Sequence, residues 1–312
     1  MARVLVTGVR GQIGSYLAEL LLADGHEVVG LAHSRSETLA VGIEVAEGSV
    51  EPGGVDALLG NNGPLDAVVH LASVTSMVRS WQEPMLTFDE NARAAVALAF
   101  GAQSKGIRLV HASSAELFGR AAAPIQNETT AIDPISPYGV AKAAAHFAVR
   151  FARREYGAAM SNLIFYLGES PRRRPDFVMR KITRTVAAIA AGRETHLTLG
   201  NTSAVRDFSH ARDLAAAAKL LALGGAPGDY VCASGEGHTI LDVATTACRL
   251  AGLDAMTCIR TDPALLRPND IPSLIGDSSA LRALGWAPTV KFEALVAELL
   301  EHAMRYEVPP CI

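Results

Sequence analysis

The chain has 312 residues, of which 49% are hydrophobic and 19% are charged, and its formal net charge at pH 7 is −4. This length predicts one large or two small domains with a sizeable core. The weakly acidic balance gives no indication of a nucleic-acid partner. No apolar run approaches the ~18 residues that a membrane span needs, and the first strand-like run, at Val4, begins too early for a signal peptide. We therefore expect a cytoplasmic protein without a membrane partner.

The four cysteines lie at positions 232, 248, 258 and 311 and form no C-x-x-C pair. Isolated cysteines fit the reduced thiols of a cytosolic protein better than a disulfide framework. No histidines or cysteines cluster at the spacing that metal ligands require. We expect no metal site.

The N-terminal half alternates short apolar runs with helical patterns. Strands are predicted at 3–8, 27–33, 65–73, 107–114 and 162–168, and helices at 11–25, 84–104 and 138–156. Continuous apolar strands that alternate with helices are typical of strands buried on both faces of a parallel sheet. The pattern therefore predicts an α/β fold built on a doubly wound parallel sheet.

The pattern changes after Gly168. A loop rich in proline and arginine is predicted at 168–177 and a helix at 178–191, followed by short elements with loops at 199–208, 222–229 and 265–272. This texture predicts a smaller α/β region. We expect a first domain at 1–166 and a second at 167–312, with the chain crossing back to the first at about 205–225.

A glycine-rich loop, "TGVRGQIG", directly follows the first predicted strand and opens the first predicted helix. Gly8 permits a tight turn, Gly11 lets the backbone approach a pyrophosphate at the helix N-terminus, and Gly14 permits close packing of helix on strand. A glycine triplet alone is a weak signal. Here the strand–turn–helix context that the motif requires is met, so the loop predicts a dinucleotide site.

The end of the second predicted strand bears on which dinucleotide is bound. NAD sites usually place a carboxylate there, on the ribose 2′-hydroxyl. The chain instead has His33 and Ser34, and Arg35 follows at a place where it could meet a 2′-phosphate. These residues favour NADP over NAD, although Arg35 also fits a plain surface arginine.

Four polar side chains surround the end of the fourth predicted strand. Ser114 and Glu116 lie at its carboxyl end, where open α/β sheets bind ligands. Tyr138 begins the following helix, and Lys142 lies one turn later on the same face. A lysine charge favours the ionised phenol, which can then exchange a proton with a substrate hydroxyl. The other interpretation of Tyr138 and Lys142 is a plain pair on a helix surface.

Together these motifs resemble the extended branch of the short-chain dehydrogenase/reductase superfamily, whose nucleotide-binding domain is of the Rossmann type. The resemblance rests on T-G-x-x-G-x-x-G at Thr7–Gly14, the serine at Ser114 and Y-x-x-x-K at Tyr138–Lys142. It implies that 1–166 binds NADP and that 167–312 mainly binds a nucleotide sugar.

Longer stretches resemble GDP-mannose 4,6-dehydratases and the related GDP-4-keto-6-deoxymannose reductases. "SAELFG", "SPYGVAK" and "ESPRRRPDFVMRKITR" are similar to the dehydratases. "LASVTSMVRSW" and "LRPNDIPSLIGDSSALRALGWAP" are more similar to the reductases, and "AVRDFSHARD" fits both. Three departures from the dehydratases bear on which reaction is expected. Leu167-Gly168 replaces the Asn-His that dehydratases usually have, and Ser49 stands where the family places an adenine-binding aspartate. The chain is also short for a dehydratase and closer in length to the reductases.

The resemblance also implies roles for further residues. Cofactor contacts are expected from Thr7, Gly8, Gly11, Gln12, Ile13, Gly14, Leu71, Ala72, Tyr138, Lys142 and Arg173. Substrate contacts are expected from Ser76, Arg79, Val178, Lys181, Arg206, Arg267 and Asp270. Arg206 and Arg267, expected on loops, suit the diphosphate because a guanidinium matches phosphate oxygens. Each also has an alternative, a local ion pair with Asp207 or a plain surface position.

As implied by the resemblance, the first hypothesis is a GDP-mannose 4,6-dehydratase. Tyr138 takes the C4 hydroxyl proton, Glu116 removes the C5 proton, and water leaves from C6. The second hypothesis is an NADPH-dependent reductase of a GDP-4-keto-6-deoxyhexose. Other nucleotide-sugar dehydratases or epimerases and a non-catalytic NADP-sensing protein stay open, because a fold does not determine function. The family forms dimers or tetramers, so a homodimer or homotetramer is expected.

Overall fold

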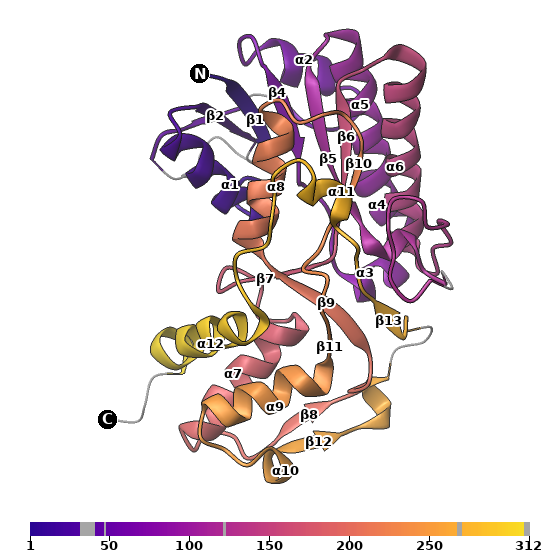
Figure 1. Ribbon diagram of the computed structural model, residues 1–312. Helices are drawn as coiled ribbons and strands as arrows, with labels where there is room; N and C mark the ends of the chain where they lie inside the picture. Colours follow the sequence, from indigo (N-terminus) through magenta and orange to yellow (C-terminus); the bar gives the residue numbers. More distant parts are fainter. Residues whose placement is uncertain (32–40, 47, 121–122, 267–269, 309–312) are drawn as a thin grey trace. The chain divides into compact units, whose positions relative to one another are not determined.

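The computed structural model describes residues 1–31, 41–46, 48–120, 123–266 and 270–308 (Figure 1). The chain divides into two compact units. Unit 1 contains Met1–Phe165, Leu214–Cys232 and Asp277–Ala287, and unit 2 contains Tyr166–Asp213, Ala233–Gly276 and Pro288–Ile312. The assignment of the cofactor to 1–166 and of the substrate mainly to 167–312 stays a prediction.

Unit 1 is built on a seven-stranded sheet in the order β10-β6-β5-β4-β1-β2-β3, in which every neighbouring pair is parallel. The strands are β1 (Arg3–Thr7), β2 (Glu27–Leu31), β3 (Ile43–Val45), β4 (Ala67–His70), β5 (Arg108–Ser114), β6 (Met160–Phe165) and β10 (Asp229–Cys232). The central strands are buried along almost their whole length, as parallel strands covered on both faces must be. The predicted fold class is confirmed.

Helices cover both faces of this sheet. They are α1 (Gln12–Ala23), α2 (Val55–Gly60), α3 (Met77–Gln82), α4 (Pro84–Phe88), α5 (Ala94–Ser104), α6 (Pro137–Tyr156), α8 (Ala211–Ala222) and α11 (Ser279–Arg282). Figure 1 shows α1 and α8 on one side of the sheet and α2, α5 and α6 on the other. Lys219 of α8 lies 2.6 Å from the carboxylate of Asp24, directly after α1. The helix predicted at 84–104 consists of α4, a π-helical turn η1 (Asp89–Arg93) and α5.

Unit 2 combines two small sheets with helices. One sheet has the order β11-β9-β13, with β7 also paired to β9, and the other pairs β12 with β8. The strands are β7 (Leu167–Glu169), β8 (Leu197–Leu199), β9 (Val205–His210), β11 (Gly237–Thr239), β12 (Ile259–Thr261) and β13 (Ser273–Leu274). The helices are α7 (Val178–Ala190), α9 (Ile240–Leu250), α10 (Ala255–Cys258), α12 (Phe292–His302), a 3-10 turn η3 (Pro263–Leu265) and a π turn η4 (Ala303–Glu307). Apolar side chains of α7, α9 and α12 form the core of this unit.

Three details of the predicted loops and strands are wrong. The strand predicted at 162–168 is two strands, because the chain leaves the seven-stranded sheet after Phe165 and β7 pairs with β9 instead. The loop predicted at 168–177 therefore starts inside β7. The loop predicted at 199–208 ends in β9, so Arg206 lies on a strand. These short strands lack a long apolar run and form through pairing with distant segments.

None of the helices that the structure describes is both long enough and apolar enough to cross a membrane. Among the same residues, no group of three or more His, Cys, Asp or Glu side chains is arranged to hold a metal ion.

The buried carboxylate of Asp207 connects β9 to two turns of unit 2. It accepts hydrogen bonds from the backbone N–H and the hydroxyl of Ser234, at 2.8 and 2.6 Å, and from the N–H groups of Gly235 and Gly276, at 2.9 and 3.3 Å. Burial raises the pKa of Asp207, and these hydrogen bonds oppose the effect. If a weaker acceptor replaced this carboxylate, some of its four hydrogen-bond donors would be left without a partner.

We expect Asp207→Asn to destabilise unit 2 by about 3 kcal/mol, since an amide leaves buried donors without an acceptor. Urea denaturation of the purified protein measures this loss. Asp176→Asn is the matched control, because its partner Arg174 and Asp176 itself are both exposed, and the expected change is below about 0.5 kcal/mol. Equal effects of the two substitutions would contradict the role given to Asp207.

Candidate active site

The glycine loop passes very close to the backbone that follows β4. Gly8 has a φ of +71°, and a Cβ on it would lie 2.8 Å from the amide nitrogen of Ala72. A Cβ on Gly14 would lie only 2.2 Å from the carbonyl oxygen of Gly8. Both positions therefore exclude a side chain, one by its left-handed backbone and the other by contact between α1 and the loop.

The hydroxyl of Thr7 connects β1 to the end of β4. Its Oγ1 accepts hydrogen bonds from the N–H groups of Leu71 and Ala72, at 3.2 and 3.1 Å, and lies 2.8 Å from Nδ1 of His70. Thr7 is fully buried. The structure thus brings together three predicted cofactor residues. The hydroxyl of Thr7 is engaged in hydrogen bonds with other residues of the protein.

The N-terminus of α1 suits an anion. Gly11 is its N-cap and makes no side-chain hydrogen bond, and the first turn contains no acidic residue. Helix N-termini with this composition attract negative charge through their N–H groups and dipole. Gln12 and Ile13, also predicted to contact the cofactor, form this first turn, and Gln12 is buried.

Four predicted residues, His33, Ser34, Arg35 and Arg267, lie outside the residues that the structure describes. Their roles stay predictions.

At the end of β5, Ser114 and Glu116 lie in a short turn. The hydroxyl of Ser114 accepts a hydrogen bond from the N–H of Glu116 at 3.3 Å, and Ala115–Leu117 form the 3-10 turn η2. Ser114 is buried, whereas Glu116 is half-buried. The turn thus holds a hydroxyl and a carboxylate at the carboxyl edge of the sheet.

The residues at the start of α6 are typical of a helix N-terminus. Ser136 is the N-cap and accepts a hydrogen bond from the N–H of Gly139 at 3.0 Å, and Pro137 occupies the first helical position. A Cβ on Gly139 would lie 2.8 Å from the carbonyl oxygen of Glu116. The first turn of α6, with Tyr138, therefore packs directly on the turn that carries Glu116.

Lys142 lies one turn further along α6 and is buried. Its Nζ donates to the carbonyl oxygen of Ala112 at 2.9 Å and lies 5.8 Å from the centre of the Tyr138 ring. Burial lowers the pKa of Lys142 to about 8. The alternative of a surface pair is wrong, because both side chains are buried in unit 1.

Unit 1 therefore brings the four predicted catalytic residues to β5, η2 and α6. A phenol beside a buried ammonium can exchange a proton with a hydroxyl. The neighbouring carboxylate of Glu116 can act on a second proton. Such a set is able to perform acid–base chemistry at two atoms of one substrate.

In unit 2, Arg206 and Asp270 contact each other. Nη2 of Arg206 donates to Asp270 at 2.8 Å, and its Nη1 donates to the carbonyl oxygens of Val205 and Ile271, at 2.8 and 2.7 Å. Asp270 also accepts from the side-chain amide of Asn201 at 3.0 Å. The suggested ion pair of Arg206 with Asp207 is wrong, since neighbouring residues of a strand point to opposite faces.

Arg173 precedes α7, and Lys181 lies in its first turn. The guanidinium of Arg173 stacks on the ring of Phe177, with its carbon 3.5 Å from the ring centre. Nζ of Lys181 donates to the carbonyl oxygen of Thr198 at 3.2 Å. Val178 is the first residue of the helix.

Ser76 and Arg79, predicted to contact the substrate, begin α3 in unit 1. The hydroxyl of Ser76 caps the helix by accepting from the N–H of Arg79 at 3.2 Å. The side chain of Arg79 lies 2.6 Å from the carboxylate of Glu83. Both residues therefore have local structural roles, and their substrate contacts stay predictions.

Sequence reasoning missed two buried groups near these residues. His70 is the partner of Thr7, and its position at the end of the apolar run "AVVH" is the only signal that the sequence offers. Glu169 is buried in β7, and burial raises its pKa to about 7 although the charges of Arg173 and Arg180 act to lower it. It stands inside the stretch that resembles the dehydratases.

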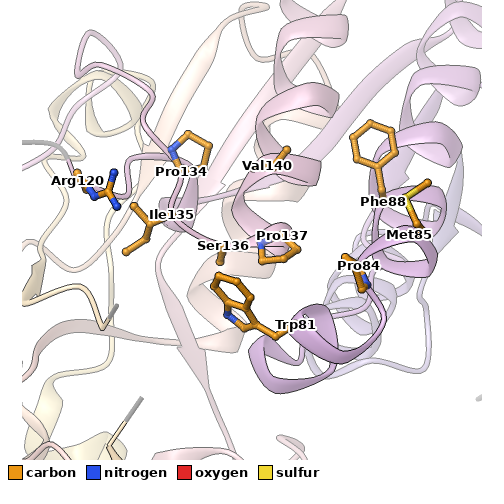
Figure 2. Close-up of a pocket in the computed structure, with 10 residues that line it drawn as sticks. All are labelled: Trp81, Pro84, Met85, Phe88, Arg120, Pro134, Ile135, Ser136, Pro137 and Val140. Carbon is orange, nitrogen blue, oxygen red and sulfur yellow. The ribbon is translucent and has the colours of Figure 1, made fainter. Parts of the chain in front are cut away.

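An apolar groove of about 450 Å³ lies beside the start of α6. Figure 2 shows its residues, which come from α3, α4, the segment before α6 and the start of α6, with Arg120 at one end. Ser136 and Pro137 line it, but none of the four catalytic candidates does.

Comparisons with known proteins agree with these motifs. The family model described as "GDP-mannose 4,6 dehydratase" matches residues 5–299. GDP-mannose 4,6 dehydratase 1 of Arabidopsis thaliana is 36% identical over 95% of this chain and 88% of its own length. The GDP-mannose 4,6-dehydratase of Yersinia enterocolitica is 30% identical over 96% of this chain and 93% of its own length. UDP-glucose 4-epimerase of Thermus thermophilus, solved with NAD, has a TM-score of 0.85 and 29% identity, covering 98% and 99% of the two chains.

The two loop glycines provide a test of the packing described above. We expect Gly14→Ala to lower the free energy of unfolding by about 3 kcal/mol, because its Cβ would collide with backbone that cannot move away. Gly11→Ala should cost less than about 1 kcal/mol, since its Cβ would meet one oxygen at 3.1 Å. Thermal unfolding followed by circular dichroism compares the pair, and similar losses at both positions would contradict this interpretation.

Proposed function

Because this chain belongs to the GDP-mannose 4,6-dehydratase family, a family of enzymes, we propose that it converts GDP-mannose to GDP-4-keto-6-deoxymannose. One observation carries the proposal. The backbone of Glu116 lies against the first turn of α6 and donates its N–H to Ser114, so the residue that carries a second acid–base group adjoins Ser114 and the turn with Tyr138. Elimination of water after oxidation needs such a group. Because some reductases that resemble this chain also carry a glutamate here, the stoichiometry of the reaction separates the two hypotheses.

The glycine loop and α1 fit a nicotinamide dinucleotide. Gly8 and Gly14 let the loop pack closely against the backbone after β4 and against α1, and the first turn of α1, which contains no acidic residue, offers an anion a positive environment. A bound nicotinamide would supply reversible hydride transfer. The missing carboxylate after β2 and the presence of Arg35 in the sequence support NADP rather than NAD.

Tyr138 and Ser114 act on the C4 hydroxyl in this proposal. The phenolate of Tyr138 takes the hydroxyl proton as the C4–H bond breaks, and the hydroxyl of Ser114 holds the same oxygen by a hydrogen bond. The ammonium of Lys142 stabilises the phenolate, because an opposite charge nearby favours the ionised form. The product of this step is a ketone at C4.

Glu116 then acts on the other side of the ketone. The C4 carbonyl acidifies the C5–H bond, and the carboxylate of Glu116 takes that proton. Transfer of the proton to the C6 hydroxyl lets water leave, so that one group serves as base and acid in turn. The C5–C6 double bond is finally reduced, since the hydride removed from C4 is returned to C6 and the proton taken by Tyr138 is returned to C5, so that the net change is loss of one water molecule.

We assign the GDP part of the substrate to unit 2. Arg206, with its guanidinium oriented by Asp270 and by two backbone carbonyl groups, suits a phosphate oxygen. Arg267 is assigned to the diphosphate on the sequence match alone. Val178 and Lys181, at the start of α7, are assigned to the guanine.

The reductase alternative differs in its stoichiometry. Purified protein is incubated with GDP-mannose and a catalytic amount of NADP, with NAD in a parallel reaction, and the nucleotide sugars are analysed by mass spectrometry. We expect loss of one water per sugar without net consumption of cofactor. A 4-ketoreductase would leave GDP-mannose unchanged and would consume one NADPH for each 4-keto sugar supplied.

The role of Glu116 is tested by Glu116→Gln in the same reaction. An amide can neither take the C5 proton nor return it, so we expect the dehydrated product to fall by about 10³-fold. GDP-mannose should still bind with an affinity close to that of the wild type. Glu51→Gln, at an exposed position, is the control and should keep full activity. Wild-type rates in Glu116→Gln would eliminate the scheme.

We assign the predicted homo-oligomer to the outer faces of α5 and α6. Phe100, Phe151 and Tyr156 contact one another there, with ring centres 5.8 to 6.5 Å apart, and each is more than a third exposed. Phe147 and Val140 continue the exposed apolar stripe along α6. Such a stripe can pack against its own copy about a twofold axis.

We expect the wild type to be a dimer or tetramer in analytical ultracentrifugation, and Phe151→Asp to dissociate it, because a charge would then be buried at the interface. Val41→Asp adds the same charge at a position that is 99% exposed and should leave the assembly intact. A monomeric wild type, or an intact Phe151→Asp oligomer, would reject this interface.

A further inference from the structure

A buried arginine of α7, Arg180, joins two distant segments of unit 2. It is only 2% exposed, a position that charged side chains occupy when they are paired. Its Nε donates to the carbonyl oxygen of Arg173 at 3.1 Å, and its Nη2 donates to the carboxylate of Glu307. One guanidinium thus connects the loop before α7 to the turn η4, which follows α12.

The loop end of this connection is centred on Arg173. Its N–H donates to the carbonyl oxygen of Ser170 at 3.0 Å, and its own carbonyl oxygen accepts from Arg180. Its guanidinium stacks on the ring of Phe177. Arg173, which the sequence resemblance assigns to the cofactor, is therefore held at its N–H, at its carbonyl group and along its side chain.

Glu307 holds the other end of the connection. Ala303 and Val308, at the two ends of the turn, lie in or against the apolar core of unit 2, so the backbone of η4 is anchored without any charge. The carboxylate of Glu307 accepts from Arg180, and its other oxygen lies 2.9 Å from Nε of Arg184. The acceptor that orients Arg180 is therefore itself fixed.

A second carboxylate, that of Glu169, interacts with Arg180 through charge alone. Glu169 is fully buried on β7, and the charges of Arg173 and Arg180 act to lower its pKa. Neither of its oxygens makes a hydrogen bond to another described residue. Without the carboxylate of Glu307, we expect the guanidinium of Arg180 to move towards Glu169 and to leave the carbonyl oxygen of Arg173, because a buried cation needs a countercharge.

We propose that Glu307 is a positioning residue for Arg173: it orients Arg180, which in turn fixes the loop so that Arg173 is ready to bind the nicotinamide dinucleotide. A group already held in its bound conformation loses less freedom on binding, which raises affinity. The link to the cofactor rests on the proposed function, but binding of the dinucleotide is measurable without any sugar. Apolar side chains such as Met179 and Val186 hold α7 in the core, so the helix should stay in place without Glu307.

The test measures binding of NADPH, with NADH in parallel, to the purified full-length protein by fluorescence titration. In Glu307→Ala we expect the Kd of the dinucleotide that the wild type prefers to rise about tenfold. Glu307→Gln keeps an acceptor without the charge, so its Kd should lie between the other two. An unchanged Kd in both variants, or a wild type that binds neither dinucleotide, would overturn the proposal.

Arg184→Met is the matched control. It removes the second pair that Glu307 makes with α7, and it leaves the hydrogen bond from Arg180 to Arg173 in place. Because the side chain of Arg184 is 43% exposed, the Kd should stay within about twofold of the wild type. If Glu307 only fastened η4 to α7, Arg184→Met would weaken binding as much as Glu307→Ala, and that result would reject the proposal.

A double-mutant cycle tests the route through Arg180. Arg180→Met removes the hydrogen bond to Arg173 directly, so it should raise the Kd at least as much as Glu307→Ala. The double variant should then bind no more weakly than Arg180→Met alone, because both substitutions act through one contact. Independent effects that multiply would contradict this route. If Arg180→Met does not fold, the comparison of Glu307→Ala with Arg184→Met still decides.

Binding of GDP separates this role from a general effect on unit 2 and from the proposed function. In Glu307→Ala the Kd of GDP should change by less than about twofold, since the assigned groups of Lys181 and Arg206 keep their own partners. An equal loss of GDP and dinucleotide binding would mean that Glu307 serves only the fold. A wild type that binds NADPH but does not dehydrate GDP-mannose would reject the proposed function, and the Kd of the dinucleotide would still decide the role of Glu307.

Discussion

The buried ammonium of Lys142 is the constraint around which unit 1 is arranged. A charged group without solvent needs acceptors and neutral neighbours, because burial strongly disfavours its charged form. The carbonyl oxygen of Ala112 provides one acceptor, at the point where β5 reaches the carboxyl edge of the sheet. This contact joins α6, the helix that carries Tyr138, to β5.

Lys142 lies in the layer between the sheet of unit 1 and α6. In this layer, polar side chains with defined partners occupy a core that apolar residues would otherwise fill. Thr7 connects β1 to β4 through two N–H groups and His70, while His146, Arg150 and Asp229 form the other end of the layer. Arg150 and Arg153 both pair with Asp229, so the carboxylate is held by two guanidinium groups. Polar groups buried with defined partners orient one another, which gives Lys142 a rigid surrounding.

Unit 2 uses the same principle at two places on β9. Asp207 and Arg206 are neighbours in sequence, yet Asp207 accepts from the turns at Ser234 and Gly276, whereas Arg206 donates to Asp270 and to backbone carbonyls. Asp207 thus stabilises unit 2, whereas Arg206 is held by its partners in one orientation. A pre-oriented guanidinium loses little freedom when it binds a phosphate.

Local sequence was sufficient for much of unit 1. The apolar runs of β1, β4 and β5, the glycines at 8 and 14, and the Ser136–Pro137 start of α6 each act within a few residues, so pattern and spacing predicted the parallel sheet, the dinucleotide loop and the Tyr138–Lys142 pair. Only the tertiary structure decided that Lys142 is buried, that β7 leaves the main sheet, and that Arg206 meets Asp270. These features depend on contacts between segments far apart in the chain, and no local pattern records which distant partner satisfies a buried charge.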